Sequence, residues 1–467
     1  GSLKAGVVDA RLSVHALASA PVPTARPRPG IAEQSADHWF TALALAGRAA
    51  VEQAGGGIDA IAFTGHMSAP CLVNAGGRPF GPVRTLADTQ CAHFLSQDAG
   101  IGALSGNEDG THFGRAKILH GLSEVPARKI AGVLAPKDVL RMALGGSLAS
   151  DPSDLANFLL LEVATGRYHA DLCCSIGLAE GQLPALKAAD SVDGALNADW
   201  AGRLGLRAGI PLVTGAGDMG SAALGVGLSR GCDAAITIGT AATILAAVPE
   251  VSAQLRGKLT FHLDGVGGRF ALASHFNGGA VLDWLHRLSG TNEARNAWLL
   301  RLATQAAARA PTARPLVLPY LLGSGSPRFD RAETARIAGL SADHDMADLI
   351  AAFQEGVAFD LADSIDALAG SGIRTGRICL GGGGTKLPGW AGMVCNVLGR
   401  ALMRPADEDL SLIGAACLGF RGLGAEVAPP GPVAGWAPDP AQVRLLRERR
   451  ARAVAMRDAG YSVSPSS

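Results

Sequence analysis

The chain has 467 residues, which is too long for one hydrophobic core, so we expect two large domains. Lysine plus arginine and aspartate plus glutamate both number 41, and this balance gives no reason to expect nucleic acid or an anionic membrane as a partner. The eight cysteines show no C-x-x-C spacing, which favours free thiols and a cytoplasmic location. The expected partner is a small molecule or another protein, and whether the chain forms a homodimer is left open.

The first apolar stretches of the chain, residues 3–9 and 12–18, predict a β-hairpin. After a proline-rich loop, Ser35 is expected to cap the N-terminus of a helix, and residues 58–64 are expected to form a strand. Near the other end of the chain, residues 442–457 carry many arginines. We interpret them as a solvated surface helix rather than an arm that binds nucleic acid.

Asp218 is the strongest candidate for a site residue, because it lies between tight glycine turns with apolar residues on both sides. Residues 210–214 predict a strand, and Gly215 and Gly217 allow the chain to stop sharply at the end of it. The side chain of Asp218 would then be exposed at the carboxyl end of the strand. A plain helix-capping acid at a glycine-rich turn is the alternative.

Two glycine-containing turns follow Asp218. An apolar run at residues 234–238 reaches Gly239 and Thr240 and returns as residues 241–248, which predicts a hairpin whose backbone N–H groups and hydroxyl can hold a phosphate. Further on, residues 378–380 form a short apolar strand that leads into four consecutive glycines. Such a run lets a flat ring approach the backbone closely.

The residues around Asp218 resemble the motif G-x-G-D-x-x-x-A-x-x-G of the FGGY family of carbohydrate kinases. The matching residues are Gly215, Gly217, Asp218, Ala222 and Gly225. The resemblance implies an α/β protein with two actin-like, ribonuclease-H-like domains and a central cleft. Residues 1–229 would form the sugar-binding domain with the catalytic base, and residues 230–467 the nucleotide-binding domain. It also implies ATP-dependent phosphorylation of a terminal hydroxyl of a sugar. Asp218 would act as the base and would lie beside Mg²⁺.

The substrate loop is most similar to that of xylulokinase-like members, which carry G-Q-M-H-G. Met67 matches that motif, Ser68 stands in place of its histidine, and His66 stands in place of its glutamine. A later segment resembles W-x-D-x-R-C, in which Asp88 keeps the acid and Gln90 replaces the arginine. The resemblance implies that Met67, Ser68 and Asp88 bind the sugar. The replacements leave open which sugar it is.

We expect Met67 and Asp88 to face Asp218 across a cleft while His66 points away, since neighbouring residues at a strand end project to opposite sides. A solvated loop histidine is the alternative for His66. Asp151 and Asp154 match the family's S-D-x-S-D segment and could equally cap the helix that follows them.

The resemblance also implies a set of residues that bind ATP. They are Ser2, Lys4, Gly239, Thr240, Gly279, Gly383 and Gly384. Ser2 and Lys4 would lie on the first phosphate loop, so we expect residues upstream of Gly1 that carry the rest of it, including an acid that helps to hold Mg²⁺. A Gly-Ser cloning scar is the competing explanation for the first two residues.

One departure from the family lies in the second half, where Ser324 and Gly325 replace the Glu-Arg pair of G-E-R-S/T-P. The polar contacts of that pair must therefore be replaced or lost. Two further functions stay in view beside a xylulose-type kinase. One is a kinase for another keto-sugar or a polyol, and the other is a sugar-binding protein of kinase descent that has no catalysis.

Overall fold

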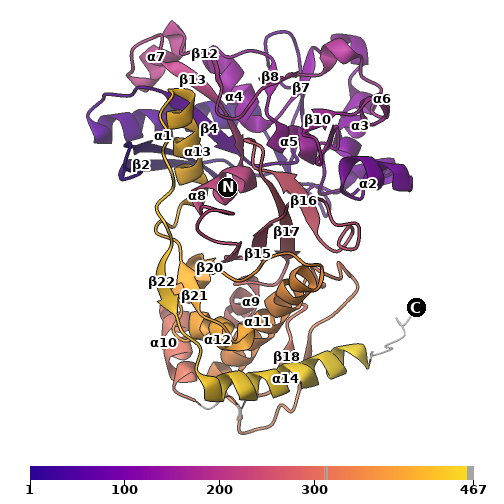
Figure 1. The fold of residues 1–467 in the computed structure, drawn as a ribbon, viewed down its shortest axis with the longest axis vertical. Helices are drawn as coiled ribbons and strands as arrows, with labels where there is room; N and C mark the ends of the chain where they lie inside the picture. The colour runs from indigo at the N-terminus through magenta and orange to yellow at the C-terminus, as the bar shows by residue number, and fades with distance from the viewer. Residues whose placement is uncertain (310, 312–313, 460–467) are drawn as a thin grey trace.

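The computed structural model describes residues 1–309, 311 and 314–459. The chain forms an α/β fold with two lobes, one above the other in Figure 1, which confirms the predicted fold class. The first half of the chain builds the upper lobe and most of the second half builds the lower one. In the part that the structure describes, every helix is too short or too polar to cross a bilayer.

The first lobe contains a hairpin and a small mixed sheet. Its longer strands are β1 (Ser2–Val8), β2 (Val14–Pro21), β4 (Ile61–Gly65), β5 (Cys71–Val73), β7 (Gly132–Leu134), β12 (Val192–Ala195) and β13 (Pro211–Gly217). Its shorter paired segments are β3 (Glu33–Gln34), β6 (Val83–Arg84), β8 (Ala149–Ser150), β9 (Leu161–Glu162), β10 (Arg167–Tyr168) and β11 (Ala185–Leu186). Strands β1 and β2 pair antiparallel, as predicted, and β13 pairs with β12 antiparallel and with β4 parallel.

Helices pack around these strands. They are α1 (Ala36–Ala54), α2 (Ala99–Ser105), α3 (Arg115–Glu124), α4 (Pro136–Leu144), α5 (Pro152–Asn157), α6 (Ala170–Cys174), α7 (Ala198–Leu204) and α8 (Asp218–Gly225). The side chain of Ser35 accepts a hydrogen bond from the N–H of Asp37, so the predicted cap of α1 is confirmed. The strand expected at residues 58–64 begins later, at Ile61.

The second lobe is organised around one seven-stranded sheet in the order β16, β17, β15, β14, β20, β21, β22. These strands are β14 (Ala234–Ile238), β15 (Ala242–Ala247), β16 (Thr260–Leu263), β17 (Arg269–His275), β20 (Ile378–Gly381), β21 (Leu402–Arg404) and β22 (Val433–Trp436), and a separate pair is β18 (Leu316–Leu318) with β19 (Arg336–Ala338). Strand β14 runs parallel to β20 and antiparallel to β15.

The helices of the second half are α9 (Ala280–Leu288), α10 (Arg295–Ala307), α11 (Met346–Gly370), α12 (Trp390–Leu398), α13 (Leu410–Gly422) and α14 (Pro440–Asp458). Helices α9 to α12 share one hydrophobic core with this sheet. Alternate residues of β14 point to opposite faces, as strand geometry requires. Ile236 and Ile238 belong to the core formed with α9 to α12, whereas Ala235 packs with α8 of the first lobe.

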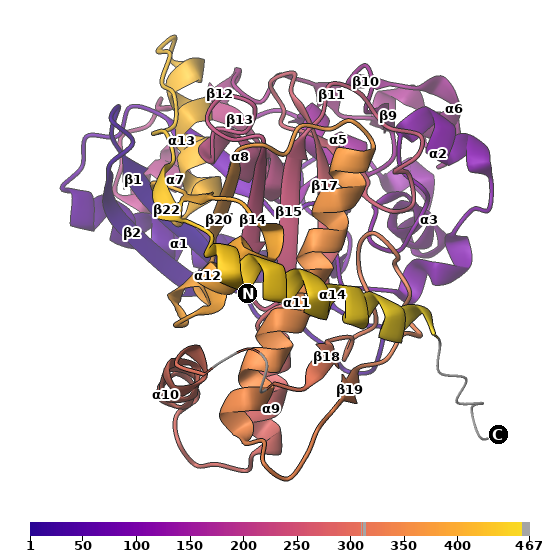
Figure 2. The same ribbon diagram turned by 60° about the horizontal axis from the view of Figure 1, so that its bottom comes forward.

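Helix α13 lies apart from the rest of the second half. It packs against α8, β4 and β13 in the upper lobe of Figure 1. The last of the described helices, α14, returns to the lower lobe and crosses in front of α11 in Figure 2. The two lobes are therefore connected through the α8–α13 pair, and the domain division at residues 229 and 230 stays a prediction.

Candidate active site

Asp218 is the first residue of α8, directly after β13. The register of β13 with β4 pairs Gly217 with Gly65, so both parallel strands end at the same edge. Gly215 has φ 76°, and a Cβ there would overlap the Phe63 carbonyl oxygen. Only glycine fits this close approach, and the predicted sharp end of the strand at Asp218 is thus confirmed.

The environment of Asp218 raises its proton affinity. The side chain is half-buried, and its Oδ1 accepts a hydrogen bond of 2.8 Å from the N–H of Met219. Burial raises the pKa of Asp218 to about 6 even though that hydrogen bond acts in the opposite direction. A carboxylate with such a pKa is ionised at neutral pH and can still take up a proton, which suits a general base.

Met67 and Ser68 lie on the loop after β4, and Met67 packs next to the residue that precedes Asp218. A Cβ at Gly217 would lie 2.5 Å from Met67 Cγ, so the methionine side chain packs on the peptide that precedes Asp218. Ser68 is buried, and its carbonyl oxygen accepts a 2.9 Å hydrogen bond from Lys117 Nζ. Burial lowers the pKa of Lys117 to about 8, against the charges of Cys91 and Asp88, which raise it.

His66 is not a solvated loop residue. Its ring lies edge-on to Trp39 of α1 with centroids 6.1 Å apart, and its Nε2 is buried without a hydrogen-bond partner among the described residues. Burial, followed by the charge of Lys117, lowers the pKa of His66 to about 4. The structure therefore excludes the solvated alternative, while the direction of His66 relative to the substrate stays a prediction.

Asp88 connects two loops inside the first lobe. Its Oδ2 accepts hydrogen bonds from the N–H of Ala32 at 2.8 Å and from Gln90 Nε2 at 2.9 Å, and its Oδ1 accepts one from the N–H of Gln90. Gln90 also donates to Glu33 Oε1 at 2.8 Å. Both oxygens of the fully buried Asp88 are thus used within the protein, and its contact with a sugar stays a prediction.

The predicted nucleotide-binding residues of the second lobe come together. Gly239 and Thr240 are exposed at the turn between β14 and β15, and the Gly279 N–H donates to the Gly239 carbonyl oxygen at 2.7 Å. The parallel pairing of β14 with β20 brings Gly383 and Gly384 to the same edge. These five residues therefore form one backbone-lined surface at the carboxyl ends of two parallel strands, where open α/β sheets bind ligands.

Ser2 and Lys4 lie on β1, and Lys4 is linked to the start of α13, which contacts Asp218. Lys4 Nζ donates to Asp409 Oδ2 at 2.8 Å, and Asp409 directly precedes α13. In the first turn of α13, Ser411 Oγ donates to the backbone oxygen of Asp218 at 3.0 Å. The contact of Ser2 and Lys4 with phosphate stays a prediction.

A buried polar layer supports the peptide before Asp218. The Gly217 N–H donates to Ser153 Oγ at 2.8 Å, and Ser153 Oγ in turn donates to Asp151 Oδ2. Asp151 also accepts from the Ser153 N–H as the N-cap of α5, so the capping alternative is confirmed for Asp151. Lys137 and Asp154 belong to the same layer, although the sequence pattern did not show that they would pack behind Asp218.

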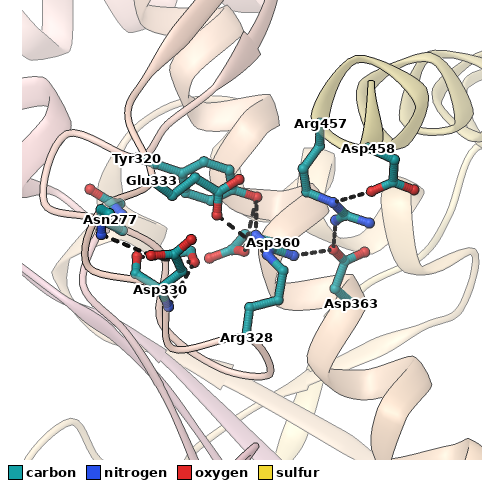
Figure 3. Close-up of polar contacts among 12 residues, drawn as sticks. Asn277, Tyr320, Arg328, Asp330, Glu333, Asp360, Asp363, Arg457 and Asp458 are labelled. Carbon is teal, nitrogen blue, oxygen red and sulfur yellow. Dashed lines mark hydrogen bonds and ion pairs between the residues drawn. The ribbon is translucent and has the colours of Figure 1, made fainter. Parts of the chain in front are cut away.

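The loop that lacks the family's Glu-Arg pair has gained other contacts (Figure 3). Arg328 reaches Asp360, Asp363 and Glu333 as well as the hydroxyl of Tyr320. Ser324 instead holds the turn itself, because its N–H donates to the Asp330 carbonyl oxygen. Arg328 therefore ties this loop to α11 through Asp360 and Asp363.

Two lobes, an acid with a pKa of about 6 at the shared end of two parallel strands and glycine loops at the carboxyl ends of the second sheet are the arrangement expected of a phosphotransferase of the actin-like type. Sequence profiles of the FGGY family of carbohydrate kinases match residues 1–225 for the N-terminal domain and 234–423 for the C-terminal domain. The chain belongs to the FGGY family and is a carbohydrate kinase that uses ATP.

Relatives of this family cover most of the chain. The xylulose kinase of Escherichia coli K12 is 29% identical over 403 residues, which are 84% of this chain and 82% of that protein. A xyloylose kinase structure from Brucella ovis is 26% identical, with a TM-score of 0.89 over 98% of this chain and 97% of that one. A gluconate kinase structure from Lactobacillus acidophilus, at 20% identity and a TM-score of 0.87 over 98% and 96%, shares the fold.

Proposed function

We propose that this kinase transfers the γ-phosphoryl group of Mg-ATP to the terminal hydroxyl of a ketopentose, with xylulose as the favoured substrate. The observation that carries the proposal is the place of Asp218 at the shared end of two parallel strands, together with its pKa of about 6. Met67 packs directly beside it, as the xylulokinase-like loop implies. The relatives named xylulose kinase support the choice of sugar.

In the proposed reaction, Asp218 accepts the proton of the sugar hydroxyl while that oxygen attacks the γ-phosphorus and ADP leaves. Gly239, Thr240 and Gly279 line the site of the phosphates, where the Thr240 hydroxyl can donate to them, and Gly383 and Gly384 let the adenine approach the chain. Positioning of the two substrates supplies most of the rate enhancement. Closure of the lobes excludes water, which would otherwise accept the phosphoryl group.

The residues present fit Mg²⁺ held mainly by phosphate. Within the described ranges, no group of three or more histidine, cysteine, aspartate or glutamate side chains could enclose a metal ion. Mg²⁺ usually binds through one or two carboxylates plus substrate phosphates, and Asp218 offers such a carboxylate. When bound, the ion neutralises charge on the phosphates.

A kinase for another keto-sugar or a polyol is the second candidate. It is favoured by Ser68 and by Gln90. Where the family carries a cationic arginine, Gln90 has a neutral amide, which donates to Asp88 and Glu33. These replacements alter the polar groups around the sugar site without touching Asp218. A sugar-binding protein that has lost catalysis remains the third candidate.

An ADP-release assay with xylulose, other pentuloses, hexuloses and polyols separates these functions. The proposal predicts sugar-dependent ADP release with the highest kcat/KM for xylulose. A higher kcat/KM for a hexulose or polyol supports the second candidate. If calorimetry shows sugar binding but none of these compounds causes ADP release from ATP, the result supports the third candidate and contradicts the role of Asp218.

We also propose a cytoplasmic location, because all eight cysteines are free thiols and seven of them are buried. The oligomeric state is a separate question. Sedimentation of the purified kinase measures whether it forms a homodimer.

A further inference from the structure

A lysine side chain is surrounded by carboxylates directly behind the catalytic residue. Lys137 Nζ lies 2.7 Å from Asp138 Oδ1, 3.0 Å from Asp151 Oδ1 and 3.3 Å from Asp154 Oδ2. None of these four side chains is more than 1% exposed. Charges removed from water to this degree must be balanced by partners or by protonation.

The network contains one more carboxylate than it has cations. Arg141 pairs with Asp138 and with Asp193, and Lys187 pairs with Asp193 from its half-exposed position. The cations are Lys137, Arg141 and Lys187, and the acids are Asp138, Asp151, Asp154 and Asp193. An uncompensated buried negative charge is costly, so we expect one of the four acids to keep its proton.

Asp154 is the acid with the fewest partners. Asp138 accepts from Ser150 Oγ as well as from its cations, and Asp151 accepts two hydrogen bonds from Ser153. The oxygens of Asp154, by contrast, receive no hydrogen bond from residues that the structure describes. The contact of Asp154 with Lys137 is also the longest of the three. The retained proton is therefore best placed on Asp154.

Asp154 also lies close to the base. Its Oδ1 is 3.2 Å from the position that a Cβ at Gly217 would take, one residue before Asp218. Burial raises the pKa of Asp154 well above its ordinary value; Lys137 opposes this, and Asp151, Asp138 and Asp218 add to it. The Cys71 thiol faces the same acids from β5, and its pKa is raised as well, chiefly by burial.

We propose that Asp154 works as a neutral, protonated acid, so that the network behind Gly217 adds no uncompensated negative charge next to Asp218. This inference rests on the proposed role of Asp218 as the base. An ionised Asp154 would place a second negative charge behind Gly217 and disfavour the ionised base. Asp154 does not itself touch the sugar or the phosphate, so it is a positioning residue.

The test is the variant Asp154→Asn, whose amide has the size of the neutral acid and no charge. Because the folded protein binds the Asp154 proton more tightly than the unfolded chain, wild-type stability is expected to fall as pH rises above 3.8 toward the raised pKa. The Asn variant lacks that loss. Its Tm relative to wild type should therefore rise as the pH increases above about 4 and level off once Asp154 of the folded wild type is ionised.

The matched control is Asp138→Asn, which removes an acid that accepts from Lys137, Arg141 and Ser150 and should lower Tm at every pH. The kcat of Asp154→Asn at pH 7 should stay within about threefold of wild type, and its pH profile should keep the acid limb of Asp218. An Asn variant that fails to fold, or that has the same Tm difference from wild type at every pH, overturns the inference. These Tm values are measured without substrate. They therefore test the protonation state of Asp154 even if the protein phosphorylates no sugar.

Discussion

The catalytic half of the site depends on buried charge, whereas the nucleotide half depends on exposed backbone. Behind Asp218, Lys137 and three acids are sealed from solvent. At the other half, Gly239, Thr240 and Gly383 are exposed, and the two glycines leave the backbone open because they carry no side chain. Removing charge should therefore impair the first half, and adding carbon atoms should impair the second.

The largest expected effect is on the catalytic half. Asp218→Asn keeps the size of the side chain and removes the proton acceptor, and loss of a general base costs about 100- to 10,000-fold in kcat. Steady-state kinetics with saturating ATP and sugar measures it. Asp199→Asn, a change at an exposed acid of α7 that pairs with Arg203, is the control and should keep wild-type kcat. A folded Asp218→Asn enzyme with normal turnover would remove Asp218 from the mechanism.

The second lobe also contains a buried ion pair, which involves none of the residues expected to bind phosphate. Arg449 of α14 donates to Glu355 Oε1 at 2.7 Å, and both side chains are buried. Arg449→Met would remove this short pair and leave the buried Glu355 with the longer 4.0 Å contact to Arg314, which should cost about 3–5 kcal/mol of unfolding free energy. Denaturant unfolding measures this loss, with Arg447→Met at an exposed position of the same helix as control.

Arg449→Met is expected to change the stability of the second lobe and not its catalysis. At temperatures where Arg449→Met stays folded, kcat and KM for both substrates should match wild type. A selective rise in KM for ATP would mean that α14 contributes to the nucleotide site and that buried charge matters in both halves.

The pH dependence of activity comes third. Since Asp218 must be ionised to accept a proton and burial raises its pKa to about 6, kcat/KM for the sugar should decrease by about tenfold per pH unit below pH 6. It should be flat just above that value. A profile that stays flat down to pH 5 in a folded enzyme contradicts the assignment of the base.

The smallest effects are expected in the glycine loop. Gly382 has φ 89°, and a Cβ there would lie 2.6 Å from the Ile238 carbonyl oxygen, so Gly382→Ala should lower stability by about 1–2 kcal/mol. A Cβ at Gly383 would meet nothing within 4 Å among the described residues. Gly383→Ala should therefore fold normally and weaken ATP binding by roughly three- to tenfold, measured by calorimetry. Unchanged ATP affinity would place the nucleotide elsewhere.

Local patterns predicted the elements that position the site. The hairpin of β1 and β2, the Ser35 cap and the glycines around Asp218 each depend on a few neighbouring residues, and the structure confirms them. The resemblance to a family added the fold, which the structure confirms, and the order of the expected phosphate loops, which stays a prediction. Neither source could show contacts between residues far apart in the sequence.

Arg449 illustrates that limit. The interpretation of residues 442–457 as a solvated surface helix is wrong at this position, because Arg449 pairs with Glu355, 94 residues away. Leu446, Arg449 and Ala453 are all buried and share one helical face, and this spacing was the available signal. The charge count around Lys137 likewise depends on packing that brings α4 and α5 together.

Phosphorus-31 NMR of the reaction mixture tests the central claim most directly. With xylulose and Mg-ATP, the account predicts a new phosphomonoester resonance that grows in equal amount with ADP, and its near absence with Asp218→Asn at the same enzyme concentration. Equal phosphomonoester formation by the two enzymes, or ADP accompanied only by inorganic phosphate in the wild type, would contradict it.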